Sequence, residues 1–285
     1  MAPGGEAAEP ALPSLSPSRA ADFKTCPLLF RFRSIDRLPE RPTVEQARGT
    51  LVHAVLEQLF DLPAADRTPQ AAAALVAPSW ARLCHAQPDL AQAFGTDGPP
   101  ELLCGARDLL GGYFAVEDPR RLQPAERESL ISAVVADALV LRGYVDRLDV
   151  APDGAVRVVD YKTGGAPREA FEARALFQVK FYALVLWRAR GVVPRALRLL
   201  YLKDAEACDY RPDAEELARF EQTLLALWRA IEAAVAARRF PPTPSRLCDW
   251  CHHRAVCPAF GGTPPPFPQV VPAARAAVES AGEAV

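Results

Sequence analysis

Asp146, Asp160 and Lys162 are the residues of this sequence whose types and spacing are best suited to chemistry. The second aspartate and the lysine end a run of valines in the segment V-V-D-Y-K-T-G. Lysine occurs only four times in the chain, although lysine and arginine together number 33. Lysine is a compact charge whose pKa can shift, whereas arginine is a planar fork that stays charged. A lysine retained here therefore indicates a chemical role. The alternative is a lysine that ends a strand by chance.

A hairpin is expected to bring the two aspartates together. The segment A-P-D-G-A at 151–155 has the proline and glycine of a three-residue hairpin turn. The resulting register pairs Asp149 with Arg157, an expected ion pair, and places Asp146 opposite Asp160 with Cβ atoms about 4.5–5.5 Å apart. The lysine two residues farther along lies on the same face. A slip of one residue would turn the apolar residues of that face to water; they are Leu148, Val150, Val156 and Val158.

Two adjacent carboxylates indicate a cation site. They repel each other, and the pKa of each rises unless a cation lies between them. A divalent ion such as Mg²⁺, bound by one or two carboxylates and a substrate phosphate, supplies that cation. The neighbouring ammonium of Lys162 could then activate a water molecule or stabilise a phosphate under attack. The alternative is an Asp–Lys–Asp ion network at the edge of a sheet.

Three of the seven cysteines are spaced as metal ligands. Cys248, Cys251 and Cys257 form the pattern C-x2-C-x5-C. Such a cluster needs a fourth ligand, and zinc could take His252 or His253. The solitary cysteines are expected to be small buried hydrophobic residues; they are Cys84, Cys104 and Cys208.

The elements expected to position these residues alternate between helices and strands. A short helix capped by Ser16 leads to Cys26, and Thr43 with Gln46 caps a second. Further helices are expected within 68–116, over 167–191 and over 212–239, with three strands between 120 and 163 and one at 195–204. This order predicts a mixed α/β fold. The sequence has no internal repeat and no G-x-x-x-x-G-K-(S/T) phosphate loop, so ATP-driven work is not expected.

The composition is that of a globular protein of one large or two modest domains. Apolar residues make up 50% of the 285 residues and charged residues 24%. The net charge of −2 argues against a generally basic nucleic-acid coat, although a local basic channel is compatible with it. Without an apolar run of about 20 residues or a signal peptide, we expect a cytoplasmic protein with no membrane span.

Five segments, in order, resemble the RecB-like exonuclease branch of the PD-(D/E)XK nuclease superfamily. They are L-S-P-S-R-A-A-D-F-K-T-C-P, R-G-T-L-V-H, G-Y-V-D-R, D-Y-K-T and Q-V-K-F-Y. With the cysteine cluster, the resemblance runs from about Leu15 to Pro258. The proline of the family name is absent before Asp146, as is usual for this branch.

The resemblance implies a fold and a domain organisation. The fold is α/β, a restriction-endonuclease-like core with a mixed central sheet flanked by helices, plus an inserted helical region and a C-terminal cysteine cluster. We expect a single nuclease domain over 15–262, with the insertion at 61–118 and the cysteine loop at 246–260. The flanking segments 1–14 and 263–285, rich in proline, alanine or glycine, are expected to be disordered.

The resemblance also implies an activity. It is the hydrolysis of DNA phosphodiesters, at single strands or ends, in repair or recombination. Mg²⁺ or Mn²⁺ would be held by His53, Asp146, Asp160 and the backbone carbonyl of Tyr161, and Lys162 would position or activate the attacking water. Gln178, Tyr182 and Arg147 would support the DNA or the active site. The alternatives are a non-catalytic subunit that binds DNA ends and a zinc-bound adaptor. Without its own motor, the protein could act with a separate helicase.

A 4Fe–4S cluster is implied by the resemblance to AddB-type and CRISPR adaptation nucleases. Its four thiolates would come from Cys26, Cys248, Cys251 and Cys257. We expect a structural role, because the cluster would join the first helix to the C-terminal loop.

The segment around the first cysteine is a candidate DNA contact. It interleaves basic residues with Phe23, Phe30 and Phe32, and arginines with aromatic rings can bind phosphates and stack on bases. The basic residues are Arg19, Lys24, Arg31, Arg33, Arg37 and Arg48. The alternative is a solvated arginine face over buried phenylalanines, because Asp22, Asp36, Glu40 and Glu45 interrupt the segment.

Overall fold

The computed structural model describes residues 12–136, 139–166 and 172–269. The chain divides into two compact units. The larger unit comprises residues 39–131 and 143–223, and the smaller unit comprises residues 1–38, 132–142 and 224–285. No helix in the described part of the chain is both long enough and apolar enough to span a membrane.

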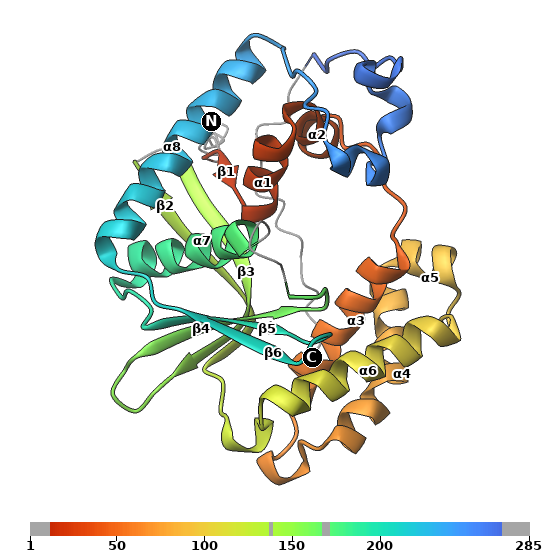
Figure 1. Ribbon diagram of the computed structural model, residues 1–285, viewed down its shortest axis with the longest axis vertical. Helices are drawn as coiled ribbons and strands as arrows, with labels where there is room; N and C mark the ends of the chain where they lie inside the picture. Colours follow the sequence, from red (N-terminus) through yellow and green to blue (C-terminus); the bar gives the residue numbers. More distant parts are fainter. Residues whose placement is uncertain (1–11, 137–138, 167–171, 270–285) are drawn as a thin grey trace, which may run out of the picture. The chain divides into compact units, whose positions relative to one another are not determined.

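A mixed sheet forms the centre of the larger unit (Figure 1). Its strands are β3 (Leu139–Val150), β4 (Val156–Lys162), β5 (Ala196–Tyr201) and β6 (Glu206–Tyr210). β4 runs antiparallel to β3 and parallel to β5, and β6 runs antiparallel to β5. The parallel step needs a crossover, which α7 (Glu172–Arg190) supplies. The predicted mixed α/β fold, with a central mixed sheet flanked by helices, is confirmed.

The hairpin between β3 and β4 has the predicted register. Asp149 lies opposite Arg157, and their side chains form an ion pair with 2.8 Å between Asp149 Oδ2 and Arg157 Nη2. Gly154 adopts φ of +81°, as the turn requires. The last backbone pair joins Arg147 to Val159. The two site aspartates therefore lie just beyond the paired part of the hairpin.

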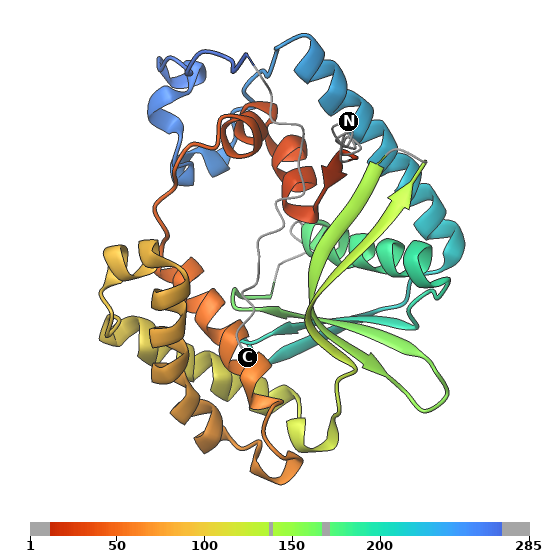
Figure 2. The ribbon, with the colours of Figure 1, turned by 180° about the vertical axis from the view of Figure 1, so that it is seen from behind.

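Helices α3 (Val44–Leu59), α4 (Pro69–Ala86), α5 (Pro88–Phe94) and α6 (Pro100–Val116) form one core with the sheet (Figure 2). Their apolar residues pack with Val159, Tyr161, Leu200 and Leu202 of β4 and the β5 end. α6 approaches the sheet so closely that a Cβ added at Gly112 would lie 1.8 Å from the carbonyl oxygen of Leu202. Thr43 and Gln46 form the predicted capping box of α3. This packing fixes α3 against the end of β4.

The smaller unit contains the chain's first helices and its cysteine loop. β1 (Ser14–Leu15) pairs in parallel with the start of β3, and α1 (Pro17–Thr25), capped by Ser16 as predicted, leads to Cys26. α2 (Pro27–Phe30) and a π-helical turn (Arg31–Ile35) follow. The cysteine loop contains the 3-10 turns Arg246–Trp250, Arg254–Val256 and Pro258–Phe260. β2 (Glu126–Val135), β3 and α8 (Ala214–Ala236) each have residues in both units.

Several details differ from the sequence-based expectations. The short strand β6 was not predicted, because E-A-C-D-Y lacks a regular apolar alternation. Cys84 is buried as expected, but the prediction for Cys104 is wrong, because that residue is exposed. Val150 is also 47% exposed rather than part of a buried face. Most of the segments expected to be disordered, and the first part of the helix expected at 167–191, lie outside the described residues. The predicted domain boundaries stay predictions.

Candidate active site

The end of β4 brings Asp160 and Lys162 into direct contact. Lys162 Nζ lies 2.5 Å from Asp160 Oδ2, and Asp160 is only 1% exposed. Asp146 of β3 is joined to the same strand, because its Oδ2 accepts a hydrogen bond of 2.7 Å from the backbone N–H of Tyr161. This side-chain hydrogen bond joins β3 to β4 just beyond the last backbone pair of the two strands. Both aspartates are thereby attached to one short stretch of β4.

His53 reaches the same stretch from α3. Its Nε2 lies 3.1 Å from the carbonyl oxygen of Tyr161, and its Nδ1 lies 3.6 Å from Asp146 Oδ2. The structure thus brings His53, Asp146 and the Tyr161 carbonyl together from α3, β3 and β4. Asp160 is on the same end of β4, paired with Lys162, but its oxygens lie outside the group of ligand atoms that are all within 4.8 Å of one another.

Glu128 joins this cluster and was missed by the sequence analysis. Its Oε1 lies 3.5 Å from His53 Nδ1, and ligand atoms of Glu128, His53 and Asp146 all lie within 4.8 Å of one another. Its backbone φ is +43°, a strained value for a residue with a side chain. β2 pairs with β3, and Glu128 lies seven residues before the end of β2, as Asp146 lies seven residues after the start of β3. The sequence has no turn motif between these strands that would have fixed their ends.

The electrostatics of the cluster are those of a site rich in carboxylates. Burial raises the pKa of Asp160 to about 6, and the charge of Asp146 adds to the rise while Lys162 opposes it. Burial alone would lower the pKa of His53, but the carboxylates of Asp146 and Glu128 raise it well above its usual value. Burial also raises the pKa of Glu57, with the charge of Glu128 contributing. A cation among these groups would relieve their mutual repulsion.

Gln178 and Tyr182 hold the lysine from α7. Gln178 Oε1 accepts a hydrogen bond of 2.8 Å from Lys162 Nζ, and Gln178 Nε2 donates one of 2.9 Å to the hydroxyl oxygen of Tyr182. Because an ammonium only donates, Lys162 selects the oxygen end of the amide, and the tyrosine hydroxyl anchors the nitrogen end. Gln178 and Tyr182 act on Lys162 as a positioning chain.

Arg147 lies on the opposite face of the hairpin and is fully buried. Its guanidinium donates to Glu117 at 2.6 Å and to the hydroxyl of Tyr161 at 2.9 Å, and it forms an ion pair with Asp149. A direct contact of Arg147 with DNA is therefore excluded by its burial. Its remaining role is to support the residue whose carbonyl faces His53.

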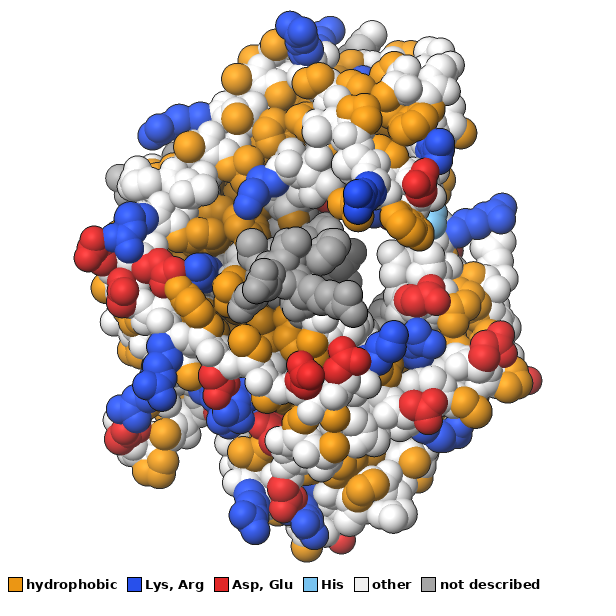
Figure 3. Space-filling model, in the orientation of Figure 1, with side chains coloured by type: hydrophobic (Ala, Val, Ile, Leu, Met, Phe, Trp, Pro, Cys, Tyr) orange, Lys and Arg blue, Asp and Glu red, His pale blue; other side chains and the backbone are white. Residues whose placement is uncertain are grey.

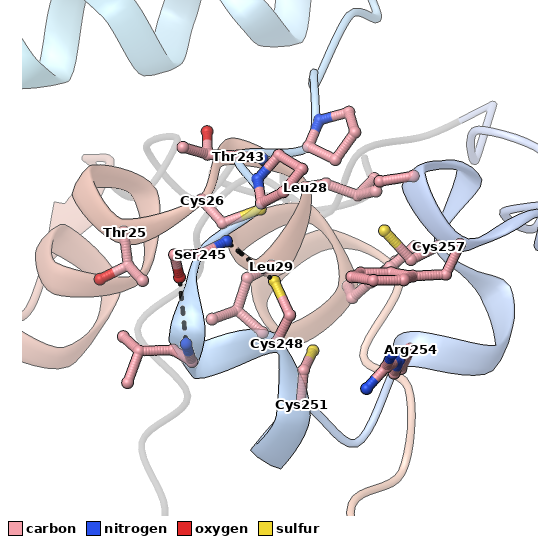
Figure 4. Close-up of a pocket in the computed structure, with 16 residues that line it drawn as sticks. Thr25, Cys26, Leu28, Leu29, Thr243, Ser245, Cys248, Cys251, Arg254 and Cys257 are labelled. Carbon is pink, nitrogen blue, oxygen red and sulfur yellow. Dashed lines mark hydrogen bonds between the residues drawn. The ribbon is translucent and has the colours of Figure 1, made fainter.

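The four predicted cluster cysteines line one pocket within the smaller unit, where their sulfurs face a common space (Figure 4). Backbone N–H groups of Thr243 and Ser245 point at Cys26 Sγ and Cys248 Sγ, at 3.4 and 3.3 Å. Among the described residues that line this pocket there is no histidine. His253 is buried against the ring of Phe32, a lining residue, but does not itself line the pocket. The pocket therefore offers Cys26, and neither His252 nor His253, as the fourth ligand.

The expected stacking of bases on the first phenylalanines is wrong for two of them. Phe30 and Phe32 are 1% and 2% exposed. Arg31 and Arg33 form ion pairs with Asp36 and Asp22, as the alternative interpretation expected. Acidic and basic side chains are also interspersed over the surface seen in Figure 3. Any basic contact with nucleic acid must therefore be local.

Comparisons with known proteins agree with this geometry. A model of the PD-(D/E)XK nuclease superfamily matches residues 14–258. The Gene 69 protein of Mycobacterium phage D29 is 24% identical over 273 residues, which cover 87% of this chain and 98% of that protein. The Gene 69 protein of Mycobacterium phage L5 is 26% identical over 141 residues, which cover 48% of this chain and 46% of that protein.

A solved structure shares the fold. It is that of a protein from Eubacterium rectale described as a candidate exonuclease, with a TM-score of 0.55 and 12% sequence identity over 84% of this chain and 87% of that one. At this identity the likeness concerns the fold alone. Because the family model spans most of the sequence, the chain belongs to the PD-(D/E)XK nuclease superfamily.

Proposed function

We propose that this nuclease is a RecB-like deoxyribonuclease that uses Mg²⁺ or Mn²⁺ to hydrolyse phosphodiesters at DNA single strands or ends. The observation that carries the proposal is the convergence of His53, Asp146, Asp160 and Lys162 from separate elements on one end of β4. The preference for single strands or ends is part of the proposal and stays a prediction. A role in repair or recombination, a cytoplasmic location and a separate helicase partner stay predictions.

The donor set fits a hard divalent ion. His53, Asp146, Asp160 and the Tyr161 carbonyl would hold it, and Glu128 adds a further oxygen ligand. When bound, the ion would polarise the scissile phosphate and lower the pKa of a bound water. The hydrogen bond from the Tyr161 N–H holds one oxygen of Asp146 in place, so the protein itself orients part of this donor set.

Lys162 is placed to act on the reacting groups. An ammonium has three N–H donors. Asp160 and Gln178 take two of them, which leaves the third for an attacking water or for the charge that develops on the phosphate. The same two partners also limit the directions in which the lysine can move.

Cleavage of end-labelled single-stranded DNA in the presence of Mn²⁺ tests the proposal. The wild type should cleave, and Lys162→Ala should lose about 10²–10⁴-fold in rate while it still binds DNA. Lys180→Ala is the matched control, because Lys180 lies on α7 but pairs with Glu216. Tight DNA binding without cleavage by the wild type would instead favour the non-catalytic end-binding subunit.

We also propose that Cys26, Cys248, Cys251 and Cys257 hold a 4Fe–4S cluster. Four thiolates suit such a cluster. Zinc bound at about 2.3 Å would place tetrahedral sulfurs about 3.8 Å apart. In the described part of the chain, the one group with three ligand atoms all within 4.8 Å is His53, Glu128 and Asp146, so the sulfurs are more widely spaced than zinc requires. Iron and acid-labile sulfide in anaerobically purified protein would support the cluster, and stoichiometric zinc in their place would contradict it.

A further inference from the structure

An open cavity of about 390 Å³ adjoins the end of β4 in the larger unit. Its basic lining residues are Arg48 of α3 and Lys203, which follows β5. Thr163 and Gly164, the residues directly after the catalytic lysine, also line it. The cavity therefore begins one residue beyond Lys162.

Both cations lack a partner in the described part of the chain. Neither Arg48 nor Lys203 makes a hydrogen bond or an ion pair with any described residue. By contrast, Arg127, Arg157 and Arg198 are each paired with a carboxylate. Two unpaired cations in one cavity are available for an anionic ligand.

The position of Arg48 depends on the small size of Gly105 in α6. A Cβ added at Gly105 of α6 would lie 2.9 Å from both Cδ and Nη1 of Arg48. The arginine thus lies across α6 at the point where that helix has only a glycine. Its guanidinium is placed by the fold and does not extend freely into solvent.

The cavity is close to the catalytic residues. Arg48 and His53 are five residues apart on α3, which corresponds to about 7.5 Å along the helix axis. A Cβ added at Gly49 would lie 3.1 Å from Thr163 Oγ1, so α3 and the segment after β4 are in contact here. The distance of about 7.5 Å along α3 between Arg48 and His53 is comparable to the distance between neighbouring phosphates of a nucleic-acid strand.

A second open cavity, of about 420 Å³, has the opposite character. It is lined by His53 together with Glu57, Glu128 and the half-exposed ring of Tyr144. A cation held by His53 and Glu128 would attract the scissile phosphate, whereas Glu57, which is not among the proposed ligands, would repel a neighbouring phosphate. The neighbouring phosphate is therefore favoured on the side of Arg48 and Lys203.

We propose that Arg48, Lys203 and the Thr163 hydroxyl bind the backbone phosphate adjacent to the scissile one. The inference rests on the proposed nuclease function and deepens it by assigning a positioning site for the substrate strand. Glu45 and Asp108 also line the cavity, but both are exposed and can turn to solvent. Because they reduce the local positive charge, recognition depends on direct hydrogen bonds from Arg48 and Thr163.

The test measures binding of a fluorescent single-stranded oligonucleotide over a range of salt concentrations, in the Lys162→Ala background. Arg48→Gln and Lys203→Gln should each weaken binding about tenfold and reduce the slope of log affinity against log salt by about 0.7, the value for one phosphate contact. Gly105→Ala keeps all charges but displaces Arg48, so it should weaken binding while the helix remains stable. Arg107→Gln is the control, since Arg107 is exposed on α6 and does not line the cavity.

Cleavage assays on the chain with Lys162 intact distinguish failure of the proposed phosphate site from failure of the proposed nuclease function. With Lys162 intact, Arg48→Gln should raise KM and leave kcat nearly unchanged. If the wild type cleaves but Arg48→Gln and Lys203→Gln keep the wild-type KM and salt slope, the phosphate site is wrong and the nuclease function stands. If the wild type neither binds nor cleaves DNA, the proposed function fails and this inference fails with it.

Discussion

The chain gathers potential metal ligands in two regions that follow different physical rules. In the larger unit, His53, Glu128, Asp146 and Asp160 offer oxygen and nitrogen donors, and hydrogen bonds from the protein already fix several of them. In the smaller unit, four sulfurs line a mainly apolar pocket, and backbone N–H groups such as those of Thr243 and Ser245 make long contacts with them. The first region is organised by the fold, whereas the second depends on what it binds. We therefore expect loss of the first to abolish chemistry and loss of the second to weaken the fold.

The largest expected effect is on catalysis, from Asp146→Asn. The amide removes a negative charge from the metal site and alters the oxygen that accepts the Tyr161 N–H. Cleavage should fall by about 10³-fold or more, which corresponds to about 4 kcal/mol or more of lost transition-state stabilisation. Thermal unfolding should change little. If Asp146→Asn is inactive because it is unfolded, the first region also stabilises the fold, which would contradict the proposed difference between the two regions.

The next effect is on stability, from Cys26→Ser. Loss of one thiolate should release iron and lower the free energy of unfolding by more than about 2 kcal/mol, because metal binding is coupled to folding. Cys104→Ser is the matched control, since Cys104 is exposed and lies outside the pocket. Calorimetry and iron analysis on both variants measure the effect. Full iron content in Cys26→Ser would show that this cysteine is not a ligand.

Glu128→Gln should act on metal affinity. The substitution removes one charged oxygen from the cluster but leaves the other ligands in place. Binding of Mn²⁺, measured by titration calorimetry without DNA, should weaken by about 10–100-fold. Excess Mn²⁺ should restore most of the cleavage. Unchanged Mn²⁺ affinity would assign the strained backbone of Glu128 to some purpose other than metal binding.

The smallest effect is expected from Tyr182→Phe. It removes the hydroxyl that accepts from Gln178, so the amide loses its second anchor and holds Lys162 less firmly. Loss of one hydrogen bond of about 1 kcal/mol should lower kcat about fivefold and leave Mn²⁺ affinity unchanged. A wild-type kcat would mean that Gln178 orients the lysine without the tyrosine.

Local sequence features predicted the elements that position the larger site. The turn at 151–155 determined the register of β3 and β4, and Thr43 with Gln46 determined the start of α3. Glu128 escaped prediction because no turn signal of comparable strength links β2 to β3. The burial of Arg147 was also hidden, since its partner Glu117 comes from a distant segment. Contacts that depend on packing between elements have no signal in local spacing.

The basic residues near Cys26 also show that nearness in sequence does not predict nearness in the fold. Six basic residues were grouped by their nearness in sequence, yet Arg48 belongs to α3 in the larger unit whereas the other five belong to the smaller one. The position of Arg48 depends on Gly105, which is more than fifty residues away in sequence. Sequence alone could identify the residue type but not the absence of a partner.

Crystals grown with Mn²⁺ would test the central claim most directly, because anomalous scattering locates each metal by element. We predict a manganese peak bounded by His53, Asp146, Asp160 and the Tyr161 carbonyl, and iron at the four cysteines. Manganese absent from the first position, at a concentration that supports cleavage, would contradict the assignment of this cluster as the active site.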